Sequence, residues 1–117
     1  MNEFALIFRN EQSPELQFSP EQMQGILAQW RNWIGGMAAQ NKLANPGHRL
    51  GLEEAAIIRK GDIVTDGPYT ELKEMLTGIL TVKVETLQEA IELGKGCPIF
   101  NAGGSVEVRQ VIPTTME

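Results

Sequence analysis

The sequence predicts an α+β domain, and three observations support that prediction. The chain has 117 residues, which is the usual size of one domain. Short runs of β-forming residues are interspersed with two longer segments that have helical periodicity. Hydrophobic residues make up 42% of the chain, enough for a core without stabilising cross-links. We therefore expect residues 1–117 to form one domain.

The first third of the chain predicts a buried strand followed by a long helix. Phe4–Phe8 is a continuous apolar run, typical of a strand that is covered on both faces. Ser19 can cap a helix, Pro20 fits its first turn, and Gln22 completes a capping box. Apolar residues then recur at helical spacing to about Gln40, namely Met23, Ile26, Leu27, Trp30, Ile34 and Met37.

The middle of the chain predicts a turn and then a hairpin. Asn45-Pro46-Gly47 combines three turn-forming residues, and the stretch from 48 to 54 has no clear pattern. Residues 55–59 and 63–65 are rich in β-formers, and Lys60-Gly61-Asp62 between them favours a tight turn.

The last third repeats the strand–helix–strand order. Residues 76–84 form a second run that is apolar on both faces, and Thr86 begins a second capping box. The helix that follows should end at Gly96, and residues 105–112 alternate like a strand. This order is the ferredoxin-like split βαβ pattern with an inserted hairpin, in which the first and third strands are central.

Two helices cover only one face of such a sheet. Ala5, Ile7 and either Leu80 or Ile79 would then form an exposed apolar patch, and such patches usually mark interfaces. We therefore expect a two-fold homodimer in which the open sheet faces stack.

Composition and motifs exclude several classes of function. A net charge of −5 without a basic run argues against a nucleic-acid partner. The single cysteine, Cys97, suits a reducing compartment, and the single histidine makes a zinc site unfavourable. No signal peptide, membrane span or nucleotide-binding loop is recognisable, so we expect a cytoplasmic protein with no membrane partner, metal or cofactor.

The segment from Val64 to Glu74, VTDGPYTELKE, resembles the signature of the YCII-related family, also called the DGPF-domain family. Tyr69 stands where the motif has phenylalanine, and Gln110 stands where the family usually has proline. The resemblance extends over nearly the whole chain. It implies a ferredoxin-like fold of the dimeric α/β barrel type, but no particular reaction. Relatives of that type include small enzymes with a pocket between helix and sheet, and members are often encoded beside extracytoplasmic-function sigma factors.

Asp66 and His48 are the candidate catalytic residues. A carboxylate at a strand end beside a Gly67-Pro68 turn can act as a general base, and histidine transfers protons near neutral pH. His48 would then pair with Asp66 across the sheet. The alternatives are that Asp66 accepts hydrogen bonds within its own turn and that His48 is an exposed loop residue.

The candidate ligand-binding residues are Gly67, Pro68, Tyr69, Trp33, Arg9 and Arg109. Gly67 leaves room for a ligand, and Tyr69 and Trp33 offer aromatic surfaces. The alternatives are that Tyr69 anchors the core, that Trp33 lines a dimer seam, and that the arginines pair with Glu107. Cys97 is expected to be buried and inert.

Two functions follow from these residues. The first is a dimeric protein that binds a small polar organic molecule between the sheet, the first helix and the Asp66 loop, and that uses Asp66 and His48 for proton transfer. The second is a non-catalytic accessory or regulatory module linked to transcription, whose acidic surface suits a basic protein partner.

Overall fold

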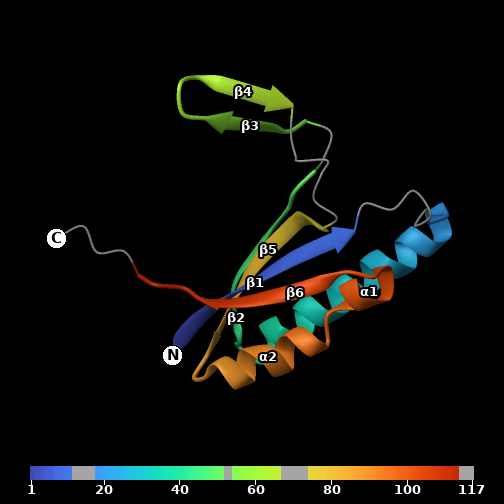
Figure 1. Ribbon diagram of the computed structural model, residues 1–117. Coiled ribbons are helices and arrows are strands. Elements are labelled where there is room, and N and C mark those ends of the chain that lie inside the picture. Colours follow the sequence, from blue (N-terminus) through green and yellow to red (C-terminus); the bar gives the residue numbers. More distant parts are fainter. Residues whose placement is uncertain (12–17, 52–53, 67–73, 114–117) are drawn as a thin grey trace.

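A computed structural model describes residues 1–11, 18–51, 54–66 and 74–113 of the chain (Figure 1). The elements, in chain order, are β1 (Asn2–Glu11), α1 (Pro20–Ala39), β2 (Leu43–Arg49), β3 (Ala56–Arg59), β4 (Ile63–Asp66), β5 (Glu74–Val84), α2 (Leu87–Lys95), a 3₁₀ helix η1 (Pro98–Ala102) and β6 (Ser105–Gln110). The chain is therefore α+β, as the sequence predicts.

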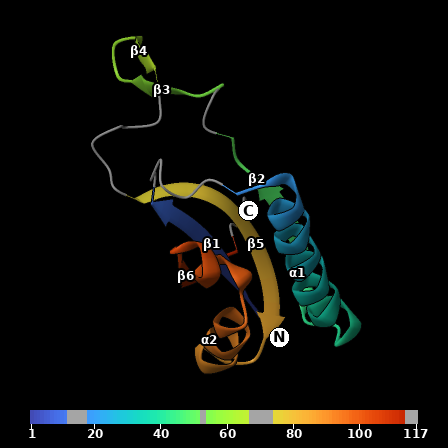
Figure 2. The same ribbon diagram turned by 90° about the vertical axis from the view of Figure 1, so that its right-hand side faces the viewer.

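Four of the strands form one antiparallel sheet in the order β2-β5-β1-β6. The two central strands are β1 and β5, which are the two runs with apolar residues on both faces. This strand order agrees with the predicted split βαβ pattern. Both helices lie on the same face of the sheet, and among the described residues no helix covers the opposite face (Figures 1 and 2).

The β3–β4 hairpin is a separate two-stranded sheet and not part of the main one. The strand that flanks β5 is β2, which contains the Asn45-Pro46-Gly47 segment. The prediction of a turn between elements at this segment was therefore wrong, although the local chemistry is turn-like, since the Gly47 N–H donates to Asn45 Oδ1 at 2.7 Å. Pro46 is tolerated because β2 is an edge strand and proline has no N–H to give to a neighbour.

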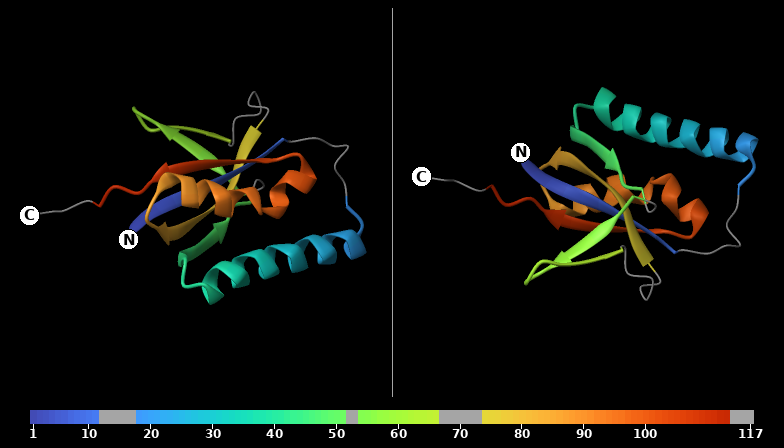
Figure 3. Two further views of the ribbon diagram at one scale, coloured as in Figure 1. Left: turned by 90° about the horizontal axis from the view of Figure 1, so that it is seen from below. Right: turned by 90° about the horizontal axis from the view of Figure 1, so that it is seen from above.

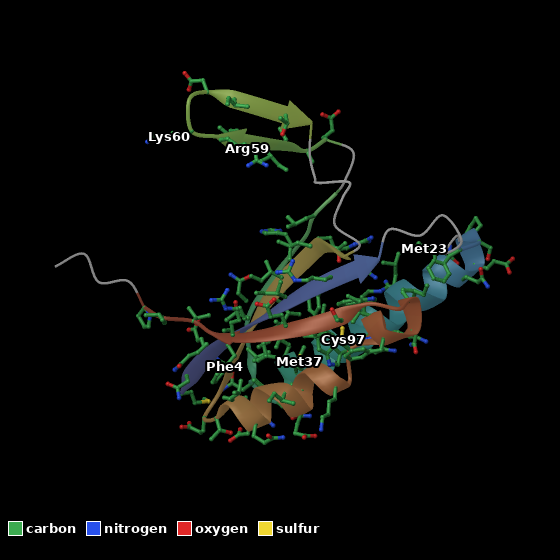
Figure 4. The ribbon with its side chains drawn as sticks, viewed as in Figure 1. Phe4, Met23, Met37, Arg59, Lys60 and Cys97 are labelled. Atoms are coloured by element: carbon green, nitrogen blue, oxygen red, sulfur yellow. The ribbon has the colours of Figure 1, made fainter. Side chains whose placement is uncertain are left out.

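The core fills the space between the sheet and the helices. Along β1 the side chains of Phe4, Leu6 and Phe8 are buried, and they alternate with residues that point to the other face. The remaining buried apolar residues are Met37, Leu80, Val82, Val84, Ala90, Cys97 and Ile99. Figure 4 shows Phe4, Met37 and Cys97 on the helix side of the sheet.

The pairing of β1 with β5 decides which side chains of β5 are covered. Leu6 pairs with Leu80, and Ile7 pairs with Ile79. Leu80 is 2% exposed beneath the helices, whereas Ile79 is 39% exposed on the opposite face. Of the two alternatives for the open patch, Ile79 is thus confirmed and Leu80 was wrong.

The helix boundaries follow the predicted capping residues. Gln22 N–H donates to Ser19 Oγ at 3.1 Å, and Ser19 N–H donates to Gln22 Oε1 at 2.9 Å, which completes the capping box of α1. Thr86 Oγ1 accepts from the Glu89 N–H at 3.2 Å and caps α2. Neither of these helices is long and apolar enough to cross a membrane.

Candidate functional site

The helix-free face of the four-stranded sheet brings together residues from all four strands. His48 of β2 pairs with Ile79 of β5, Ile79 pairs with Ile7 of β1, and Ile7 pairs with Glu107 of β6. Directly paired residues point to the same face of a sheet, so these four side chains form one row. With strands about 4.8 Å apart, the row is roughly 14 Å long.

A second row lies beside the first. It runs from Asn45 through Thr81 and Ala5 to Arg109. Its central residues have small side chains, and they are only partly covered. The two rows form a floor that is apolar at its centre and polar at both edges. Sequence reasoning missed Asn45 on this face, because no local pattern marked residues 43–49 as a strand.

The β6 edge of this floor carries a cluster of three charges. Arg9 Nη2 donates to Glu107 Oε1 at 3.3 Å, and Arg109 Nε lies 3.9 Å from Glu107 Oε2. The predicted pairing of Glu107 with arginine is confirmed. Two guanidinium groups share one carboxylate, so the cluster has a net positive charge within an acidic protein. The Arg109 side chain is 71% exposed, which keeps most of this charge in contact with solvent.

The opposite edge of the floor carries His48. The sequence predicted a loop at this residue, whereas the structure places it on β2. Gly47 positions it. The backbone of Gly47 has φ 66°, and a Cβ at this position would overlap the carbonyl oxygen of Ile79. Glycine thus allows the irregular edge strand to approach β5 closely, so that His48 falls opposite Ile79.

Asp66 is the last residue of β4 and pairs with Ala56 at the base of the hairpin. It does not belong to the four-stranded sheet that contains His48, and the pairing of Asp66 with His48 stays a prediction. The remaining motif residues of the candidate site, Gly67, Pro68 and Tyr69, lie outside the described residues.

Trp33 lies on the other side of the sheet from the arginine cluster. Its Nε1–H donates to the backbone oxygen of Leu93 at 3.0 Å. Its ring packs edge-on against Phe8 and Trp30, with centroid distances of 6.0 and 5.7 Å. The structure therefore brings Arg9 and Arg109 together but leaves Trp33 in the layer beneath the sheet.

Aromatic packing of Phe8, Trp30 and Trp33 lies between the sheet and the first helix, and the Asp66 loop that would complete the expected pocket lies outside the described residues. Among the described residues, a shallow hollow of about 440 Å³ lies between α1 and η1, and it is lined by Gln29, Asn32, Lys95, Gly96, Cys97, Pro98, Phe100 and Asn101. Burial raises the pKa of the Cys97 thiol to about 12, against a smaller opposing effect of a hydrogen bond with the Ile99 backbone. Cys97 is thus a poor nucleophile, as expected.

Metal-binding residues do not gather at either place. Within the part of the chain that the structure describes, no three His, Cys, Asp or Glu side chains lie close enough to hold an ion. The acid–base and charged groups of the helix-free face therefore define the candidate site.

Comparison with known proteins places the chain in a family. No curated protein matches it. The family model of the YCII-related domain matches residues 4–115, which is nearly the whole chain and includes all six strands and both α-helices, apart from the first two residues of β1. The chain therefore belongs to the YCII-related domain family.

Proposed function

We propose that this protein is a homodimer that binds a small organic anion of the carboxylate class on the helix-free face and performs acid–base chemistry on it without a cofactor. The arginine cluster of β1 and β6 is the observation that supports this proposal. Two arginines share one carboxylate beside an apolar floor. Arginine binds carboxylates through paired N–H donors, which suits recognition of an organic acid.

Arg109 is the better of the two arginines for direct contact with the anion. Its Nε approaches Glu107 at 3.9 Å, a distance longer than a hydrogen bond, and its side chain is largely exposed. Arg9 hydrogen-bonds to Glu107 and is more covered. In the proposed complex Arg9 holds Glu107 in place, while Arg109 turns toward the ligand carboxylate.

The apolar floor would carry the body of the ligand. Ile7 and Ile79 separate Glu107 from His48 along the row, so a molecule anchored at Arg109 extends over them toward β2. We propose His48 as the group that transfers a proton at the far end of the ligand. Asp66 is proposed as its partner, and Gly67, Pro68 and Tyr69 as further ligand-binding residues.

A second copy of the chain would exclude water from this floor. Acid–base catalysis and anion binding both strengthen when solvent is removed, because the local dielectric falls. The exposed Ile79 and the absence of a helix on this face are consistent with stacking of two such faces.

Ligand binding can be tested by a thermal-shift screen of small organic acids on the wild type and two variants. Arg109→Gln removes the proposed anchor, and Arg31→Gln removes an exposed arginine of α1 as a matched control. A ligand raises the melting temperature of a protein that binds it. We expect at least one acid to stabilise the wild type and Arg31→Gln but not Arg109→Gln. Equal stabilisation of all three proteins would contradict the proposed site.

The catalytic part needs a separate assay. The stabilising acid would be incubated in D₂O with the wild type, and NMR would detect turnover or exchange of its carbon-bound protons. His48→Gln and Asp66→Asn should each abolish the reaction while the acid still binds. Asp62→Asn, in the turn of the same hairpin, is the control and should retain it. Full activity of both test variants would contradict the assignment of proton transfer to His48 and Asp66, and no turnover by the wild type would leave a binding protein without catalysis.

A further inference from the structure

The β3–β4 hairpin lacks a hydrophobic core of its own. Each of its strands has four residues, and an isolated two-stranded hairpin is at best marginally stable in water. Its apolar side chains are nevertheless solvent-exposed in the single chain, since Ile58 is 77% and Val64 is 62% exposed. A hairpin of this composition requires another surface against which to pack.

The strand register shows that both faces of the hairpin carry apolar residues. Ile58 pairs with Val64 on one face. On the other face Ile57 pairs with Thr65, and Ile63 pairs with Arg59. Because paired residues share a face, neither face of the hairpin is purely polar. The hairpin thus suits a position between two protein surfaces better than one in solvent.

The hairpin rises on the same side as the helix-free face. Figures 1 and 3 show it on the side of the sheet opposite to the two helices, and Figure 4 shows Arg59 and Lys60 near its far end. The radius of gyration of 16.0 Å exceeds the value of about 13 Å expected for a compact chain of this length. Any layer that packs on the helix-free face therefore lies beside the projecting hairpin.

The dimensions indicate that this layer is a second copy of the chain. Four strands about 4.8 Å apart, over the six residues of β6, present a flat area of roughly 400 Å². A stable interface buries about 800 Å² per partner, so the sheet face alone is too small. A hairpin with apolar residues on both faces adds to this area. Two-fold symmetry doubles that contribution, because each copy supplies both a hairpin and a face.

The hairpin is long enough to make this contact. Four residues extend about 13 Å, and stacked sheets lie about 10 Å apart. We propose that in the homodimer each β3–β4 hairpin crosses to the partner and packs Ile58 and Val64 against the partner's helix-free side, next to Ile79, where it forms one wall of the candidate site. This inference rests on the homodimer of the proposed function but not on its ligand.

The mass in solution provides the first test. Analytical ultracentrifugation over a range of concentrations should give twice the chain mass of 12.9 kDa for the wild type. Ile58→Ser combined with Val64→Ser should raise the dimer dissociation constant at least tenfold. Leu87→Ser, which alters a half-exposed apolar residue on the helix side, should leave it unchanged. Equal dimer dissociation constants for the wild type and the double variant would overturn the exchange of hairpins. A monomeric wild type would overturn the dimer as well, whereas the Arg109→Gln ligand test would still stand by itself.

Cross-linking provides a second test that does not depend on the folding of the double variant. Copies carrying Ile58→Cys would be mixed with copies carrying Ile79→Cys and treated with a short bismaleimide. The expected product is a covalent pair of unlike copies. Copies carrying Leu87→Cys in place of Ile79→Cys should give none, and neither should the wild type, whose thiol is buried. Cross-linking of Ile58→Cys to Leu87→Cys with the same yield would contradict the proposed contact.

Discussion

Arg9 and Glu107 lie on neighbouring strands, and the Arg9 guanidinium donates to the Glu107 carboxylate at 3.3 Å on the helix-free face. The two residues are 98 positions apart in the chain, so only the pairing of β1 with β6 brings them together. Arg109 approaches the same carboxylate from the next open-face position of β6. Glu107 therefore limits the positive charge that this edge of the sheet presents to a ligand.

Glu107→Gln should strengthen the binding of anions to the helix-free face. The substitution removes the one carboxylate that the two arginines share, while it keeps the size of the side chain. Because the pair is partly exposed to solvent, the loss of stability should be no more than about 1 kcal/mol. Urea unfolding measures the stability, and equilibrium dialysis with a small carboxylate measures the binding. Glu92→Gln on α2 is the control, and an equal gain in binding there would contradict the prediction.

Gly47→Ala should destabilise the fold by about 2 kcal/mol or more, because it combines a positive φ with an overlap against the backbone of β5. The added Cβ would meet the Ile79 carbonyl, and β2 would have to move away from β5. Gly51→Ala, where a Cβ meets no atom, serves as the control and should be nearly neutral. Denaturant midpoints of the two variants give the comparison, and similar midpoints would show that β2 is not held as described.

Cys97 should make stability fall as the pH becomes alkaline. Burial raises the thiol pKa from 9.0 to about 12 in the folded state. The contribution of this group is therefore fully present below pH 9, where the thiol is neutral in both states. It is lost as the pH rises from 9 toward 12, because the unfolded chain ionises first. Cys97→Ala should show a flatter decline of unfolding free energy over this window.

The same thiol should be unreactive in the native protein. A colourless disulfide reagent that releases a chromophore should react slowly with folded protein at pH 8 and rapidly after addition of guanidinium chloride. Fast labelling of the folded protein would mean that Cys97 is reached by solvent, contrary to its burial.

Leu6→Ala should test whether the helix side of β1 is the centre of the core. Leu6 is fully buried and pairs with Leu80 and Val108. Removing its side chain should cost about 2–5 kcal/mol, since a cavity remains. Ile112→Ala, at a site that is 81% exposed, should change the unfolding free energy by less than about 0.5 kcal/mol. Comparable losses in the two variants would place the core elsewhere.

Local features were predictable from the sequence because their causes are local. Ser19 and Gln22 satisfy each other's backbone groups within one turn, so the start of α1 could be read from four residues. The alternation of Val106 and Val108 with Glu107 and Arg109 likewise predicted which side chains share the open face with Arg9. Apolar residues on both sides of β1 and β5 marked the central strands.

The tertiary structure decided the features that depend on contacts between distant segments. The strand character of residues 43–49 comes from pairing with β5, and proline and glycine in that segment hide it from any local pattern. The hairpin forms from local turn chemistry, but its separation from the main sheet depends on which strand takes the edge beside β5. In the same way His48 and Glu107 occupy one row only through two intervening strands. The sequence by itself therefore determined the elements, their caps and their apolar faces, whereas the floor of the candidate site arose from strand pairing, which acts over tens of residues of chain.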